Sequence, residues 1–144
     1  MNILFLVHIE DAMRPCMSPR YPERVAEVVF AAEYDRVYAM TSGFEHDPYI
    51  WEIGGVVTAE IEWAWGYEPE AFEDQPKELP WLIESAGHEY TWVPPELRNL
   101  ARLLRLPDVS VTVGGGVDGE CLTDFCCVLD HLEVEYQVDR AIVY

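Results

Sequence analysis

Residues 109–144, with the sequence VSVTVGGGVDGECLTDFCCVLDHLEVEYQVDRAIVY, constrain the fold more than any other part of the chain. The segment begins with alternating β-branched residues, which are typical of a pleated strand. Three consecutive glycines follow at 114–116, and glycine adopts backbone conformations that other residues resist. The pattern predicts a strand, a glycine turn, a helix and a closing strand at 141–144.

The helix predicted after the glycine turn carries one apolar stripe. Its members are three or four residues apart, as on a single helix face: Leu122, Phe125, Cys126, Leu129 and Leu132. Asp118 is predicted to cap this helix, because its carboxylate accepts hydrogen bonds from free amides. Cys121 is predicted in the first turn, off the stripe and facing the glycines. A helix N-terminus stabilises a thiolate, so Cys121 stands where a nucleophile would lie in an open α/β sheet.

The rest of the chain supplies the other parts of an α/β domain. An apolar run at 3–7 predicts a buried strand, helical spacing follows Pro22, and residues 36–40 predict a second strand. Pro94 and Pro95 open a further helix. Short β–α–β connections favour parallel pairing with right-handed crossovers. We therefore predict one three-layer, doubly wound, Rossmann-like α/β domain over residues 1–144, with a mainly parallel sheet.

Residues 44–90 interrupt this regular pattern. They contain many carboxylates, a single lysine at Lys77 and four of the five tryptophans, namely Trp51, Trp63, Trp65 and Trp81. Residues 56–65 fit a strand or a helix, and residues 81–91 predict a short strand. We interpret the segment as an acidic, tryptophan-rich excursion. It forms either the wall of a pocket or an edge strand with an ordered surface segment, and the second is favoured because aromatic residues more often supply packing area.

Two motifs point to a known family. The runs GGVDGECL and TWVPPELRNLARLLRLPDVSVTVGG, which lie within residues 90–144, resemble the segment that carries the nucleophile in the isochorismatase-like cysteine hydrolases. The resemblance implies that Cys121 attacks an amide or a related small molecule. It also implies that backbone amides of the turn hold the oxyanion, from Gly115, Gly116, Val117, Asp118, Gly119 and Glu120. Members of this family often form homo-oligomers, so self-association is a further expectation.

At the positions of the family's other catalytic residues, this chain has different residue types. The family uses an aspartate near the end of the first strand as general base, and here that strand leads into His8, Glu10 and Asp11. It also uses a lysine before the PPEL-like helix, a position held approximately by Ser85 or His88 in this chain. The resemblance therefore implies that His8, Glu10 or Asp11 moves the proton, and His88 is a further site candidate.

Charge excludes several classes of partner. The chain has 9 Lys and Arg against 27 Asp and Glu, for a formal net charge of −18. This disfavours nucleic acid and anionic membranes, because binding to them rests on neutralising phosphates. Three explanations remain open: an acidic-proteome or salty setting, an acidic face for a basic protein partner, or mimicry of nucleic acid. No apolar run is long enough to span a membrane and the opening lacks a signal-peptide pattern, so we expect a cytoplasmic protein.

Metal and disulfide chemistry have little support in the sequence. The four cysteines form no CxxC pair, and without a secretion signal all four are expected to be reduced. Candidate metal ligands exist, but no two histidines have HxH or HxxxH spacing: His8, Asp11, Cys16, His46, His88 and His131. We predict no metal and no cofactor.

Three functions remain. The first is an isochorismatase-like cysteine hydrolase that acts through Cys121 on a small-molecule substrate. The second is a catalytically silent, acidic binding protein on the same fold, whose partner is a basic protein or a second copy. The third is a nucleotide- or small-molecule-binding α/β protein in which Cys121 has no role. A lowered thiol pKa favours the first, and an ordinary thiol favours the second.

Overall fold

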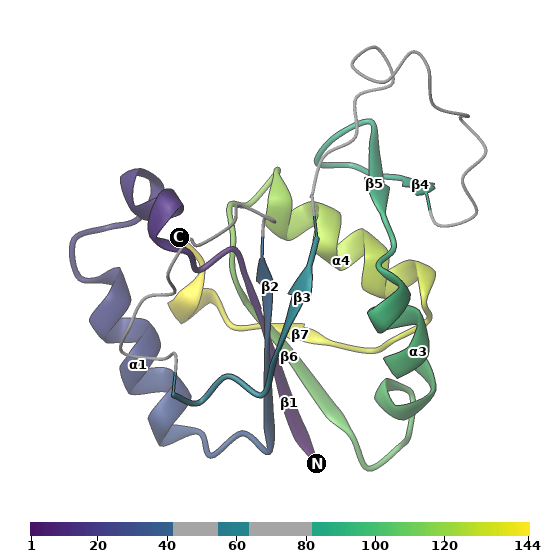
Figure 1. Ribbon diagram of the computed structural model, residues 1–144, viewed down its shortest axis with the longest axis horizontal. Coiled ribbons are helices and arrows are strands. Elements are labelled where there is room, and N and C mark those ends of the chain that lie inside the picture. Colours follow the sequence, from purple (N-terminus) through teal and green to yellow (C-terminus); the bar gives the residue numbers. More distant parts are fainter. Residues whose placement is uncertain (42–54, 64–81) are drawn as a thin grey trace.

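The computed structural model describes residues 1–41, 55–63 and 82–144 (Figure 1). Five parallel strands form one sheet in the order β3-β2-β1-β6-β7, with bounds β1 Asn2–Val7, β2 Arg36–Thr41, β3 Ala59–Glu62, β6 Ser110–Gly115 and β7 Gln137–Val138. The described α-helices are α1 (Tyr21–Ala31), α3 (Pro95–Leu104) and α4 (Cys121–His131). Short 3-10 helices occupy Asp11–Cys16 (η1) and Arg140–Ile142 (η3).

The central strand β1 shows why the domain has three layers. Its side chains alternate between the two faces of the sheet, as a pleated strand requires. Ile3, Phe5 and Val7 belong to the core beneath α3 and α4, whereas Leu4 and Leu6 pack with residues of α1. Figure 1 shows α1 on one side of the sheet and α3 and α4 on the other. All five residues from Ile3 to Val7 are inaccessible to solvent, which explains the continuous apolar run.

The predicted α/β class and the mainly parallel sheet are confirmed. The strand and helix expected around the glycine turn are present as β6 and α4. Of the predicted α4 stripe, Leu122, Phe125 and Leu129 are buried, whereas Cys126 and Leu132 are half-buried. The buried face also includes Cys121, Asp124 and Val128. Within the described residues, no helix combines the length and the apolar character needed to cross a membrane.

Two local predictions near the end of the chain are wrong. The strand expected at 141–144 is instead the 3-10 helix η3, because the Asp139 side chain accepts a hydrogen bond from the Ala141 amide at 3.0 Å and starts a helical turn. The strand itself lies earlier, at β7. Asp118 does not cap α4, because Arg140 binds its carboxylate and the helix begins after Glu120 without a side-chain cap.

The described parts of the excursion at 44–90 form the strand β3 and a two-stranded hairpin. β3 adds a parallel strand to the sheet beside β2, which settles the strand-or-helix alternative for 56–65 within its described residues. An antiparallel hairpin of β4 (Leu82–Glu84) and β5 (Tyr90–Trp92) replaces the single short strand expected at 81–91. Trp51, Trp65, Lys77 and Trp81 lie outside the described residues.

Candidate functional site

The predicted site residues gather at the carboxyl edge of β1 and β6. These two neighbouring strands pair with Val7 opposite Gly115, and the sheet order runs in opposite directions on either side of them. In open α/β sheets, ligands bind at this switch point. His8 follows β1, and the turn from 116 to 120 follows β6. Tyr144 crosses the same edge, since its hydroxyl donates to the His8 carbonyl at 2.7 Å and its amide donates to the Gly116 carbonyl at 3.1 Å.

Cys121 is the first residue of α4, as expected, but its side chain is only 5% exposed. Its sulfur accepts a hydrogen bond from the Val117 amide at 3.2 Å, so the thiol faces the turn. Burial raises the pKa of the Cys121 thiol, and the opposing effect of the nearby amides is smaller. This direction is opposite to the one expected from a helix N-terminus. The thiol is therefore protonated at neutral pH.

The amides predicted to hold an oxyanion are largely used inside the turn. The Val117 amide donates to the Cys121 sulfur, and the Gly119 amide donates to the Thr123 hydroxyl at 2.8 Å. The amides of Glu120 and Leu122 both donate to the Val117 carbonyl, at 3.1 and 3.2 Å. An oxyanion hole needs donors aimed at the position of the reacting oxygen. Three of the six predicted donors, the amides of Val117, Gly119 and Glu120, are instead used in hydrogen bonds within the turn and to the first turn of α4.

His8 is buried in an aromatic environment. Its ring stacks on Trp63 with centroids 5.2 Å apart, and Nε2 donates to the Trp63 carbonyl at 3.1 Å, because a carbonyl oxygen can only accept. Burial lowers the pKa of His8 to about 4, although the Trp63 carbonyl acts in the opposite direction. Its backbone is left-handed, with φ of 48°. His8 is thus a neutral imidazole held by Trp63.

The other two candidates from this edge have different positions. Glu10 is almost fully buried, with 2% of its surface exposed. Asp11 is the first residue of η1, and its side chain lies outside the described part of the structure.

His88 belongs to a cluster that the sequence only partly indicated. Its ring Nδ1 and its amide both donate to the Asp124 carboxylate, the amide at 3.0 Å, and the Ser85 hydroxyl donates to the same carboxylate. Asp124 is fully buried and lies one helical turn beyond Cys121 on α4. These hydrogen bonds hold the turn of the β4–β5 hairpin against α4. They use Nδ1 of the His88 ring and do not involve Nε2. Among the described residues, no hydrogen bond joins His88 to Cys121.

Asp124 was missed, although the sequence contains a signal for it. An acidic residue between Leu122 and Phe125, on the face that packs in the core, requires partners because an unpaired buried charge is costly. Ser85 and His88 supply them from a hairpin 36 to 39 positions earlier in the chain. That distance in sequence is why spacing alone did not identify the cluster.

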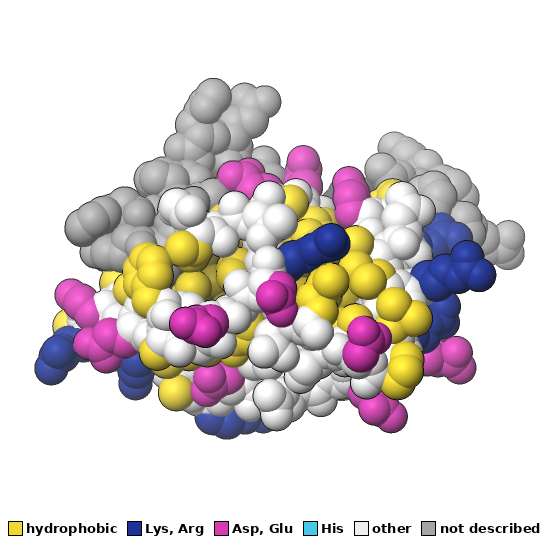
Figure 2. Space-filling view, turned by 90° about the horizontal axis from the view of Figure 1, so that it is seen from below, with side chains coloured by type: hydrophobic (Ala, Val, Ile, Leu, Met, Phe, Trp, Pro, Cys, Tyr) yellow, Lys and Arg dark blue, Asp and Glu magenta, His cyan; other side chains and the backbone are white. Residues whose placement is uncertain are grey.

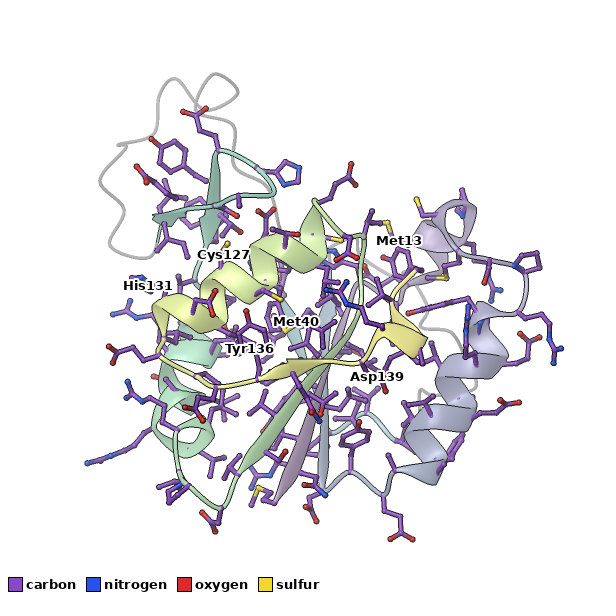
Figure 3. The ribbon with its side chains drawn as sticks, turned by 180° about the vertical axis from the view of Figure 1, so that it is seen from behind. Met13, Met40, Cys127, His131, Tyr136 and Asp139 are labelled. Carbon is purple, nitrogen blue, oxygen red and sulfur yellow. The ribbon has the colours of Figure 1, made fainter. Side chains whose placement is uncertain are left out.

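The structure gives no support to a metal centre in the part of the chain it describes. No group of three His, Cys, Asp or Glu side chains within residues 1–41, 55–63 and 82–144 is placed to hold an ion. His131 lies at the far end of α4 from Cys121 (Figure 3), and His46 lies outside the described residues. All four cysteines are free thiols, of which Cys16 is exposed.

Comparison with protein-family models, with curated proteins and with solved structures found no match.

Proposed function

We propose that this chain is a non-catalytic binding protein whose partner is a basic segment of another protein. The observation that carries the proposal is the turn at 116–120. Three of its amides, those of Val117, Gly119 and Glu120, are used in internal hydrogen bonds, and Cys121 is buried with a raised pKa, which together disfavour the chemistry of a cysteine hydrolase.

The charge of the chain supports a basic partner. A net charge of −18 attracts cationic surfaces and speeds their association. Two ion pairs between arginine and carboxylate among the described residues are Arg105 with Glu133 and Arg140 with Asp118, all on exposed side chains. Figure 2, seen from the amino ends of the strands, shows acidic side chains spread over that face. Most of the negative charge is therefore not neutralised by these pairs.

Binding of a defined basic peptide tests the proposal. We expect a fluorescent peptide of alternating glycine and arginine to bind saturably, and a glycine–glutamate peptide of the same length not to bind. Binding should persist at about 1 M salt, where the Debye length is about 3 Å, because specific contacts are screened less than the general field. Cys121→Ser should bind equally well. Binding that vanishes at high salt, or that never saturates, would show only a polyelectrolyte effect.

A cysteine hydrolase of the isochorismatase-like kind is the second candidate, favoured by the hydrogen bond from the Val117 amide to the Cys121 sulfur. In this reaction the thiolate attacks an amide carbon, the C–N bond breaks and the amine leaves with a proton. Water then hydrolyses the thioester and restores the thiol. The reaction requires a base to ionise Cys121, because burial holds the thiol in its protonated form.

Alkylation of the native protein separates the two candidates. We expect iodoacetamide to modify Cys16 readily and Cys121 slowly, because Cys16 is exposed and Cys121 is buried with a raised pKa. The modification of each cysteine is read by peptide mass across a pH series, with urea-unfolded protein as the reference for accessible thiols. Fast reaction of Cys121 with a midpoint well below about 8.5, the free-thiol value, would favour the hydrolase.

A further inference from the structure

A groove of about 470 Å³ lies between the carboxyl end of β3 and the start of α3. Its volume falls within the range of about 300–1,000 Å³ that is usual for ligand sites. Buried Trp63 and Pro94 and half-buried Trp92 give it an aromatic and apolar lining. Glu62, at the end of β3, and Glu96, in the first turn of α3, are exposed and line the same groove.

The tryptophan side of the groove is preorganised. The indole Nε1 of Trp63 donates to the Trp92 carbonyl at 3.0 Å, which joins the end of β3 to the end of β5. The Trp63 ring also stacks on His8 and meets the edge of Phe125, with ring centroids 5.2 and 5.4 Å apart. A side chain held on several sides loses little freedom when a ligand binds, so less of the binding energy is spent on ordering the site.

The electrostatics of the groove select a cation. Among the described residues that line it, two are carboxylates and none is Lys, Arg or His. The start of a helix normally favours anions through its free amides. Here Pro94 precedes α3 and Pro95 is its first residue, and proline has no N–H to donate. The groove therefore combines carboxylates with aromatic rings and has fewer amide donors than an ordinary helix start.

We infer that this groove receives an arginine side chain from the basic partner. The inference rests on the proposed function and names the site and the chemistry of its ligand. A guanidinium ion suits the lining because its planar fork donates two parallel hydrogen bonds to one carboxylate and stacks on aromatic faces, which lysine does less well. Tryptophan is the most favourable ring for such a cation, and here that ring is half-buried Trp92, because Trp63 is only 1% exposed. The apolar lining accommodates the methylene stem of arginine.

The test compares two short blocked peptides, Ac-Ala-Arg-Ala-NH2 and the same peptide with citrulline, the uncharged isostere of arginine. Each is titrated into the isotope-labelled full chain, and the indole N–H signals are followed by NMR. We expect the arginine peptide to shift the signals of Trp63 and Trp92 saturably, and citrulline to bind at least about tenfold more weakly, which is about 1.4 kcal/mol.

A matched pair of variants separates the groove from the general negative field. E62Q/E96Q should weaken binding of the arginine peptide at least about tenfold, whereas E27Q/E135Q, which removes two exposed charges outside the groove, should change it less than about twofold. Three results would each overturn the inference: equal losses of affinity in the two double variants, equal binding of the arginine and citrulline peptides, or unchanged NMR signals of Trp63 and Trp92. If the longer glycine–arginine peptide still binds saturably to E62Q/E96Q, the groove is wrong and the proposed function stands. If neither peptide binds, both fail.

Discussion

Replacing Gly115 with alanine is expected to lower the free energy of unfolding by about 4 kcal/mol, since overpacking and backbone strain each cost about 1–3 kcal/mol. A Cβ at Gly115 would lie 2.4 Å from the Val7 carbonyl oxygen and 2.9 Å from the Val7 nitrogen. Both contacts are with the backbone of the central strand β1, which cannot move without disturbing two strand pairs. Gly115 also has φ of 74°, a conformation that alanine resists.

Gly119→Ala is the matched control for the close approach of β6 to β1. Gly119 has a similar φ of 78°, but a Cβ there would meet no atom within 4 Å. Gly119→Ala should lower the free energy of unfolding only through backbone strain, by about 1–2 kcal/mol. Urea denaturation followed by tryptophan fluorescence measures both values, provided that the m-value does not change. Equal destabilisation by the two variants would mean that backbone strain alone makes glycine necessary at 115.

The stability of Gly115→Ala also tests why glycine occurs at position 115. The resemblance to the cysteine hydrolases implies that Gly115 and Gly116 shape an oxyanion site. The structure gives Gly115 a packing reason that needs no ligand, because β1 and β6 approach each other closely at Val7. A large loss of stability in Gly115→Ala therefore explains the glycine without catalysis.

The sequence predicted the parts of the fold that depend on local periodicity. β1, α3, β6 and α4 follow from apolar runs or three-to-four spacing, and their positions are close to those expected. β3 was ambiguous because AEIE has a single buried residue, Ile61, and three exposed ones. Its strand geometry comes from pairing with β2, which no pattern within those four residues encodes.

The site was less predictable because its properties depend on burial and on contacts between distant segments. Position alone placed Cys121 at the start of α4, but the direction of its pKa shift depends on how deeply the thiol is buried. The groove depends on Trp63 and Trp92 meeting across 29 positions of sequence. The pairing of His88 with Asp124 likewise joins a hairpin to a helix. Such contacts become visible only once the elements are packed.

His8 is expected to make the protein progressively less stable as the pH falls from about 6.5 to about 4, by about 3 kcal/mol in total. In the unfolded chain His8 has an ordinary pKa of 6.5 and is protonated over most of this range. In the folded protein the pKa of His8 is about 4, so the ring stays neutral until the pH approaches that value. Stability therefore rises with pH across this window and is fully present above it. The physical cause is the burial of His8 against Trp63.

His8→Asn isolates this contribution. Asparagine is uncharged and tolerates the left-handed backbone that His8 adopts. Because the carboxylates are the same in both proteins, their shared pH dependence cancels when the variant's free energy of unfolding is subtracted from that of the natural chain. The difference should shrink by about 3 kcal/mol between pH 7 and pH 4. An NMR titration of the His8 ring provides an independent midpoint. A difference that stays constant would mean that folded His8 accepts protons as freely as in water, and would restore it as a base for Cys121.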